Sequence, residues 1–379
     1  MLAPIVSDAA AHRQALIARA RECLQAGAVA AVHAGIEPWI VRSWQRCLQA
    51  GMRPHQRVSF APVSSAQAHD ATEAHHALVT AARPVIEQLT RATAGMRYFA
   101  MLTNAYGIVV DVQGPVDRHD ARARAIGRVG VDLSEAAVGT TAIGAALTEL
   151  QPVWLHRGEH FCDDNAAFSC AGAPLFDPAG RCMGMLDLTG VEVPERPELR
   201  HLVARSARAI EDALVCGQAH ALLLRLNWPG GALGGEGVGL MTLDAEGFVT
   251  GANTAARQML PMPLRPPGSA LHASDLFALP WTLLMDAART QRPGVIDLPL
   301  WSGLRLQAQA HVQTAQPARA SAPLPAVGTW GAAPLRETET ELIRRAVQDA
   351  RGNVAEAARA LGISRATVYR KLGGGARKR

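Results

Sequence analysis

The sequence predicts a multidomain α+β protein that ends in a small all-α module. Strand-length and helix-length apolar patterns alternate over most of the chain, two segments dense in Gly or Pro interrupt them, and the last 45 residues contain three short helical patterns separated by glycine. A chain of 379 residues has room for about two or three domains of ~100–200 residues each.

Composition places the boundaries between the predicted parts. The stretch NWPGGALGGEG is dense in Gly and Pro, and TAQPARASAPLPAVGTWGAAPL is rich in Pro and Ala, so we interpret both as linkers. We expect an N-terminal helical segment at 1–60, an α+β domain at 61–200, a connecting helix at 197–226, a second α+β domain at 236–313, a linker at 314–334 and the C-terminal module at 335–379.

Several helices are predicted in and around the first α+β domain. An Ala-rich amphipathic helix is expected at 8–35, another at 68–92 that Pro84 interrupts, and one long helix at 196–226. In IEPWIVRSWQRCLQAGMRP, Pro38 suits the first turn of a further helix. The apolar side chains on one face of that helix, which we interpret as a packing face, are Trp39, Ile40, Trp44 and Leu48.

Strands are predicted from short apolar runs on either side of turn residues. FAMLTNAYGIVVDVQG contains two strands around a turn at Asn104–Gly107, and GAPLFDPAGRCMGMLDLTG contains a hairpin that turns at Asp177–Gly180. In the second α+β domain, GVGLMTLDAEGFVTGANTAARQML predicts two strands and then a helix opened by Asn253, with later strands at 297–312.

The last 45 residues predict a helix-turn-helix. Glycines 352 and 362 separate three helical patterns, and the hydroxyl of Ser364 is placed to cap the third helix. Val368 and Leu372 face inward on that helix, so its basic and hydroxyl residues face outward. Arg365 suits a guanine edge and Thr367 a base or phosphate, while Arg370 and Lys371 can neutralise phosphates. The alternative is a small helical hairpin with a solvated basic face.

Charge is concentrated in the same module. Residues 335–379 hold eleven Lys and Arg against five Asp and Glu, whereas residues 1–334 hold 27 against 28. The whole net charge of +5 therefore comes from the C-terminal module, as expected if this part alone meets nucleic acid.

The stretch GNVAEAARALGISRATVYRKL, residues 352–372, resembles the Fis-type helix-turn-helix that ends many bacterial enhancer-binding proteins. In that family the first helix contributes to a dimer and the third enters the major groove of double-stranded DNA. The resemblance implies a homodimer whose DNA contacts are Ser364, Arg365, Thr367, Arg370 and Lys371, with Asn353 as a phosphate contact.

The first α+β domain resembles a GAF domain of the acetoin-catabolism-regulator group of sigma-54-dependent activators. The matching elements are LTNAYG at 102–107, GVDLSE and GTTAIG within 130–144, GEHF at 158–161, and APLFDPAG with GMLDLTG within 173–190. R-S-W-x-R-C before the domain resembles the same group. Such domains cup a small molecule between a sheet and overlying helices. The resemblance implies a ligand pocket with polar groups from Asn104, Ser134, Glu135, Thr140, Thr141, Glu159 and His160. Alternatively, these residues cap turns and satisfy buried backbone.

The second α+β domain resembles the start of a PAS domain, in a degenerate form because the middle of the domain is unusually rich in proline. It carries no haem histidine or flavin cysteine signature. In the full-length group an AAA+ ATPase stands before the DNA-binding module, yet neither its phosphate loop G-x-x-x-x-G-K-[ST] nor GAFTGA occurs here. The only lysines are Lys371 and Lys378, so we predict no ATPase motor.

His160, Cys162, Asp163 and Cys170 raise the question of a metal site or a nucleophile. No second histidine stands at ligand spacing and no base adjoins Cys170, so we predict no metal, no cofactor and no catalytic residue. Two alternatives remain, namely a cysteine-dependent enzyme on the GAF scaffold and a sensory subunit that acts through a partner protein.

These observations together predict a ligand-responsive regulator that binds DNA and is not an enzyme. Its further partners would be a small-molecule effector and RNA polymerase, which it would recruit or block. The chain lacks a signal-peptide pattern and any run of ~18 apolar residues, so we expect a cytoplasmic protein without a membrane span.

Overall fold

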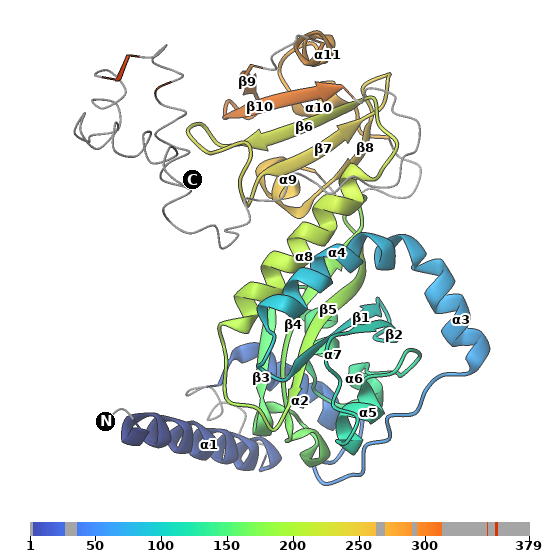
Figure 1. The fold of residues 1–379 in the computed structure, drawn as a ribbon, viewed down its shortest axis with the longest axis vertical. Coiled ribbons are helices and arrows are strands. Elements are labelled where there is room, and N and C mark those ends of the chain that lie inside the picture. The colour runs from blue at the N-terminus through green and yellow to red at the C-terminus, as the bar shows by residue number, and fades with distance from the viewer. Residues whose placement is uncertain are drawn as a thin grey trace, which may run out of the picture. The chain divides into compact units, whose positions relative to one another are not determined.

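The computed structural model describes residues 3–26, 36–262, 270–289 and 294–312, together with Val347, Asn353 and Val354. The chain divides into two compact units, Met1–Thr314 and Ala315–Arg379. The first unit contains two antiparallel five-stranded sheets, here named the first and the second sheet domain together with the helices packed on them (Figure 1). Among the described residues, no helix is both long enough and apolar enough to cross a membrane.

The first sheet has the strand order β2-β1-β5-β4-β3, and all neighbouring strands are antiparallel. The strands are β1 Tyr98–Asn104, β2 Val109–Gln113, β3 Val153–His156, β4 Phe168–Phe176 and β5 Cys182–Val191. The turn between β4 and β5 lies where the sequence predicts it, because Gly180 has a φ of 86° and its N–H donates to the Asp177 carbonyl at 2.8 Å. This hairpin supplies the central strand, β5, and its neighbour β4.

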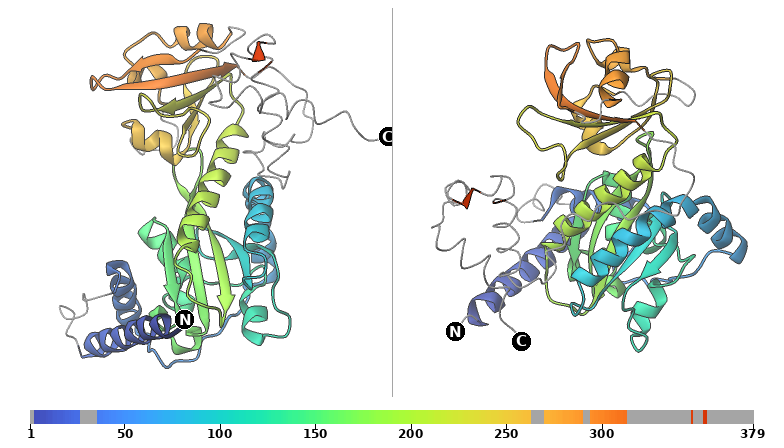
Figure 2. Two further views of the ribbon diagram at one scale, coloured as in Figure 1. Left: turned by 60° about the vertical axis from the view of Figure 1, so that its left-hand side comes forward. Right: turned by 45° about the horizontal axis from the view of Figure 1, so that its top comes forward.

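Each face of the first sheet packs in a separate core. On β5, Leu186 and Leu188 belong to one core and Met185 to the other, so Asp187 faces the same side as Met185. Helices α4 (His76–Ala92) and α8 (Leu199–Cys216) run side by side over the Leu186 face (Figures 1 and 2). The Met185 face is therefore covered by other elements.

Those elements are short helices and loops from both sides of the sheet in sequence. They are α2 (Pro38–Gln49), α5 (Ala121–Ile126), α6 (Glu135–Val138) and α7 (Ala142–Glu149), together with the 3-10 turns η2 (Arg157–Glu159) and η3 (Asp163–Asn165). Helix α1 (Ala3–Gln25) lies against η2, whereas α3 (Ser65–Ala74) extends from the domain and buries none of its side chains (Figure 1).

The second sheet has the strand order β8-β7-β6-β10-β9. Its strands are β6 Leu222–Asn227, β7 Gly239–Leu243, β8 Val249–Ala252, β9 Ile296–Pro299 and β10 Arg305–Val312, and its helices are α9 Thr254–Met259, α10 Ala273–Leu276 and α11 Thr282–Ala288. Asn253 caps α9 through a bond from the Ala256 N–H at 2.8 Å, as the sequence predicts. Strand β9 is an edge strand that pairs only with β10 among the described strands.

Two predicted helices need correction. The long helix expected at 196–226 is wrong beyond Cys216, because residues 222–227 form strand β6. Leu222, Leu224 and Leu226 are buried while the residues between them are half-buried, so this leucine run alternates at period two. The helix expected at 68–92 breaks at His75 instead of Pro84, and Pro84 lies inside α4.

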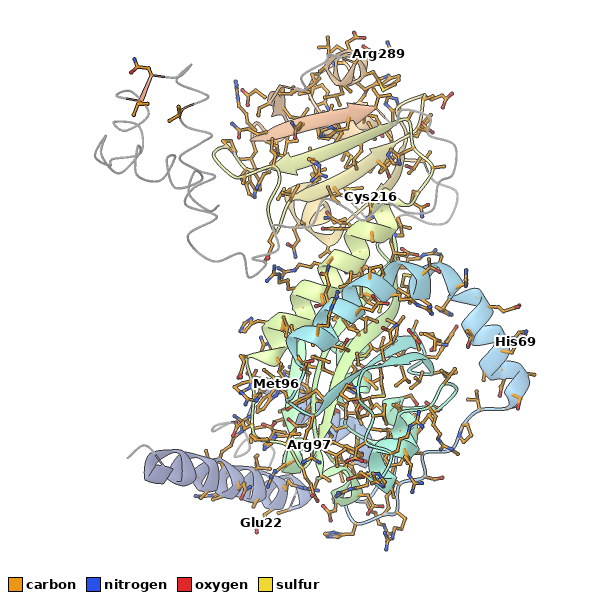
Figure 3. The ribbon with its side chains drawn as sticks, viewed as in Figure 1. Glu22, His69, Met96, Arg97, Cys216 and Arg289 are labelled. Carbon is orange, nitrogen blue, oxygen red and sulfur yellow. The ribbon has the colours of Figure 1, made fainter. Side chains whose placement is uncertain are left out.

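The two sheet domains contact each other through α8 and the β4–β5 turn. Cys216 at the end of α8 packs with Val238 and Leu240 of the second domain (Figure 3). The Pro178 carbonyl accepts bonds from the Ala252 N–H at 3.0 Å and from Arg257 Nη2 at 2.6 Å. The hairpin that builds the centre of the first sheet is thus bonded directly to the second domain.

Two carboxyl groups on α8 complete this contact, those of the buried Glu211 and the half-buried Asp212. Glu211 accepts the Phe176 N–H at 3.2 Å and the Thr254 hydroxyl at 2.7 Å, and Asp212 accepts Asn253 Nδ2 at 2.7 Å. Burial raises the pKa of Glu211 to about 7. The α8 carboxylates therefore bridge strand β4 of one sheet to the β8–α9 corner of the other.

Candidate functional site

A small cavity lies on the Met185 face of the first sheet, beneath the segment that carries His160. The cavity has a volume of about 20 Å³, which is enough for about one water molecule. Its lining residues are Phe60, Met101, Ile126, Leu133, Thr141, Ala142, Ile143, His160, Asn165, Phe168, Cys170, Asp187 and Thr189. The walls are mostly apolar, with polar groups supplied by β4, β5 and the loop after β3.

Three polar atoms of cavity residues are buried and have no hydrogen-bond partner. They are His160 Nε2, Asn165 Oδ1 and Asp187 Oδ1, and all three side chains are at most 1% exposed. A buried polar atom without a partner costs about 1–3 kcal/mol, so such atoms in a native protein are usually satisfied by water or a ligand. All three residues line the same cavity, which makes it the candidate site of the first sheet domain.

The contacts of His160 determine which of its ring nitrogens can accept a hydrogen bond. Nδ1 lies 2.9 Å from the Arg157 carbonyl, which can only accept, so the proton sits on Nδ1. Burial lowers the pKa of His160 to about 4, so the ring is neutral near pH 7. Nε2 therefore carries a lone pair that has no hydrogen-bond partner.

Asn165 and Asp187 each use only one of their two polar side-chain atoms in a hydrogen bond. Asn165 Nδ2 donates to the Val138 carbonyl at 2.9 Å, which leaves Oδ1 as an acceptor. The Thr189 hydroxyl donates to Asp187 Oδ2 at 2.5 Å, and Cys170 Sγ lies 3.2 Å from the same hydroxyl. Burial raises the pKa of Asp187 to about 7, because no cation compensates its charge there.

The loop that carries His160 is held in place by the two N-terminal helices. Arg13 of α1 pairs with Glu159 at 2.6 Å, and Glu159 also accepts the His156 N–H at 2.8 Å. The Trp44 indole N–H of α2 donates to the Glu159 carbonyl at 2.8 Å, and Arg21 Nη2 donates to the Phe161 carbonyl at 2.6 Å. Moving His160 away from the cavity would therefore disturb contacts with both helices.

Of the seven ligand contacts predicted from the sequence, the structure places two, Thr141 and His160, on the cavity. Thr141 caps α7 by accepting the Gly144 N–H at 3.2 Å. Asn104 Oδ1 instead accepts the N–H groups of Tyr106 and Ile108, both at 3.0 Å, within the β1–β2 turn. Ser134 stands directly before α6. The predicted ligand roles of all seven residues stay predictions.

Glu135 and Thr140 take part in a polar cluster under α2. Arg46 binds both carboxylate oxygens of Glu135, at 2.6 and 3.0 Å, and reaches Glu149 at 3.0 Å. The Ser43 hydroxyl contacts Glu135 and lies 2.7 Å from the Thr140 hydroxyl. The R-S-W-x-R-C motif thus fastens α2 onto α6 and α7, which explains its polar residues structurally.

The sequence does not predict Asn165 and Asp187 as cavity residues. For Asp187 a signal existed, because LDLT at 186–189 alternates apolar and polar residues, and a carboxylate at the inward position of a central strand is unusual. Asn165 stands in a loop, where no periodicity indicates its direction. Its burial depends on the packing of η3 against α6, which the sequence does not reveal.

The thiols of the cysteine-enzyme alternative are buried. Burial raises the pKa of Cys162 to about 11 and that of Cys170 well above its usual value, so both are protonated at neutral pH. In the part of the chain that the structure describes, no three His, Cys, Asp or Glu side chains are grouped to hold a metal ion.

Of the predicted DNA contacts, the structure describes only Asn353, whose side chain is exposed directly before helical Val354. Ser364, Arg365, Thr367, Arg370 and Lys371 lie outside the described residues.

Two protein-family models match this chain, one over its N-terminal half and one over its C-terminal module. The family model described as MimR, N-terminal domain, matches residues 10–212. The chain belongs to this family. The model for the Fis family of bacterial regulatory proteins matches residues 334–373, which confirms the Fis-type helix-turn-helix predicted from residues 352–372.

Relatives of this MimR-type chain include curated transcriptional regulators. The acetoin catabolism regulatory protein of Cupriavidus necator is 30% identical over 228 residues, which are 58% of this chain and 34% of that protein. The propane 2-monooxygenase operon transcriptional activator MimR of Mycolicibacterium goodii is 30% identical over 200 residues, 52% of this chain and 33% of that protein. The predicted resemblance to the acetoin-regulator group is confirmed. The chain spans about a third of the length of these relatives.

Among solved structures, a chain in the crystal structure of the E. coli DhaR(N)–DhaL complex is similar to the MimR-type chain over 72% of its residues and 99% of that chain. The TM-score is 0.45 and the sequence identity is 15%.

Proposed function

We propose that this chain is a transcription regulator that senses a small molecule with its first sheet domain and binds double-stranded DNA with its C-terminal Fis-type module. The observation that carries the proposal is the joint occurrence of a MimR-type N-terminal domain and a Fis-family match on the part of the chain that holds all of its excess positive charge. Relatives with the same N-terminal type are named as regulators of transcription.

The finer domain assignments belong to this proposal. The first sheet domain would be a GAF-like sensor and the second a degenerate PAS-like domain. A five-stranded antiparallel sheet with a mostly apolar cavity under short helices supports the first assignment, and the strand–turn–strand–helix order at 239–259 supports the second. The protein would act as a homodimer that recruits or blocks RNA polymerase, without an ATPase motor.

A route for the signal runs from the cavity to the second domain. Cys170, Asp187 and Thr189 line the cavity from β4 and β5, and the turn of this same hairpin bonds to Ala252 and Arg257. A ligand changes the regulator only if it binds one arrangement of these elements better than another. A shift of β5 against β4 would reach Arg257 through the turn that joins the two strands.

A gel-shift assay with promoter DNA next to the chain's own gene tests the DNA-binding role. We expect Arg365→Ala and Arg370→Ala each to weaken binding, Arg365→Ala by about 5- to 150-fold because a bidentate base contact is lost. Affinity should also fall steeply with salt. Arg305→Ala is the matched control, since it removes one exposed arginine paired with Asp297 in the second sheet domain. Equal retardation by all three variants would contradict the DNA contacts, and a chain that retards no duplex in dilute buffer would favour the partner-protein alternative.

Arg257→Ala tests the route for the signal. We expect unchanged DNA affinity without effector and loss of the effector-dependent change, because the guanidinium bond to the Pro178 carbonyl is gone. The measurement is a gel shift with and without a compound found by thermal shift. Arg289→Ala, which removes the exposed arginine directly after α11, is the control (Figure 3). A full effector response in Arg257→Ala would show that the signal travels elsewhere.

A further inference from the structure

A groove lies between helix α1 and the segment 156–158 that ends β3 and begins η2, here named the α1 groove. Five of its lining residues come from α1, and it shares no lining residue with the cavity on the Met185 face. Its volume is about 270 Å³, against about 20 Å³ for that cavity. The α1 groove therefore has room for several water molecules or a small organic molecule without any change in the structure.

The side chains that line the α1 groove carry an excess of positive charge. Arg13, Arg21 and Arg157 line it, and Glu195 is the only carboxylate among its lining residues. Burial lowers the pKa of His156 to about 4, and the charges of Arg157 and Arg13 contribute, so this ring adds no charge near pH 7. In the part of the chain that the structure describes, Arg157 is exposed and has no ion pair. Its guanidinium is therefore the positive charge that no carboxylate neutralises.

The other two guanidinium groups are already held in place. Arg13 pairs with Glu159 at 2.6 Å and with Glu195 at 3.0 Å. Arg21 pairs with Asp163 at 2.9 Å, and only 18% of its side chain is exposed. Because these contacts fix both arginines before a ligand arrives, little side-chain entropy is lost when the groove is filled.

The backbone at Arg157 is also fixed. Its φ of 51° lies in the left-handed region, which costs a residue other than glycine about 1–3 kcal/mol. The Arg157 carbonyl accepts the His160 N–H at 3.0 Å and lies 2.9 Å from His160 Nδ1, and these bonds hold the turn. On the other side, Gly158 packs so closely on α1 that an added Cβ would lie 3.3 Å from Ile17 Cγ2. The turn thus sets the point from which the unpaired guanidinium leaves the chain.

We propose that the α1 groove binds a small organic oxyanion, a carboxylate or a phosphate ester, with Arg157 as its charge partner and Arg13 and Arg21 beside it. A guanidinium group offers paired N–H donors that match the two oxygens of such an anion. Ile17 and Ala18 add carbon surface for a short apolar body. This site is additional to the sensing and DNA-binding roles proposed above, and neither role depends on it.

Calorimetric titration of the full chain in dilute buffer with benzoate, phenyl phosphate and benzamide tests the ligand class. Benzamide has the shape of benzoate without its charge, so we expect it to bind more weakly by about tenfold or more than the better of the two anions. Added salt should weaken anion binding. The tighter of the two anions identifies the oxyanion as a carboxylate or a phosphate. Absence of saturable heat from both anions, or equal affinity for benzamide, would overturn the inference.

Arg157→Gln locates the site, because it removes the unpaired charge and keeps most of the side-chain length. We expect the affinity for the better anion to fall by about tenfold or more. Arg83→Gln is the matched control, since it removes an exposed arginine of α4 that does not line the groove. Full anion affinity in Arg157→Gln, or an equal loss in both variants, would place the binding elsewhere and overturn the site.

A second pair of variants tests the site from α1. Ala18 is exposed and lines the groove, so Ala18→Glu and Ala18→Gln introduce side chains of the same size without disturbing a packed position. We expect the anion to bind Ala18→Glu more weakly than Ala18→Gln by about tenfold or more, because the new carboxylate competes for the guanidinium groups. Equal anion affinity in these two variants would show that charge in the groove does not govern binding, and would contradict the proposal.

Discussion

Replacing Trp44 with alanine is expected to lower the free energy of unfolding of the first sheet domain by about 3–5 kcal/mol. The indole is fully buried, with 0% of its surface exposed, and its N–H donates to the Glu159 carbonyl at 2.8 Å. The substitution removes the packing and leaves a buried carbonyl without its partner. Denaturant unfolding followed by circular dichroism measures the loss.

Trp301→Ala is the matched control for this change. Trp301 is 69% exposed in the second sheet domain, so the same substitution should cost about 0.5 kcal/mol or less. A similar small loss for Trp44→Ala would contradict the role of α2 as a fixed cover of the sheet. Because Glu159 precedes His160, the same variant should also weaken binding in the cavity.

Replacing Asp187 with asparagine is expected to remove much of the pH dependence of stability between about pH 4 and 7. The pKa of Asp187 in the folded chain, about 7, lies above the usual 3.8, so the folded state keeps a proton that the unfolded state releases in this range. The contribution of Asp187 to stability is therefore greatest below this range and is lost as the pH rises to about 7. A difference of about 3 pH units corresponds to at most about 4 kcal/mol.

Asparagine keeps the shape of the side chain and still accepts the Thr189 hydroxyl, so the variant should be more stable than the parent at pH 8. Denaturant midpoints from pH 4 to 8 measure this. Burial also raises the pKa of Glu211 to about 7 and shifts stability in the same direction, so the Asp187→Asn profile keeps a residual slope that Glu211→Gln should reduce. Parallel profiles for Asp187→Asn and the parent would show that Asp187 is ionised in the folded chain.

The sequence predicts the parts of this chain that local chemistry specifies. The turn at Asp177–Gly180 and the Asn253 cap are set by residues within a few positions of one another, and both lie where expected. The leucine run at 222–227 misled the helix prediction, because a short apolar run does not reveal its period without knowledge of its neighbours.

The site was less accessible from the sequence because its contacts join distant residues. Arg46 and Glu135 are 89 positions apart, and Arg13 and Glu159 are 146 apart. The residues next to Glu135 and Glu159 in the sequence do not indicate that each carboxylate pairs with an arginine from an N-terminal helix. The sequence therefore predicts polar residues in the correct domain. Only the packing shows which of them hold helices together and which of them line the cavity.

Strand β9 has a consequence for how copies of this chain can associate. It has four residues, exposes Asp297 and ends in Pro299, which has no N–H to offer to an incoming strand. A short edge strand with a charged side chain and a proline is a poor template for an added strand. Fibre growth and strand pairing between copies of the chain through β9 are therefore both disfavoured. A twofold assembly suited to a symmetric operator would then have to be built from other surfaces.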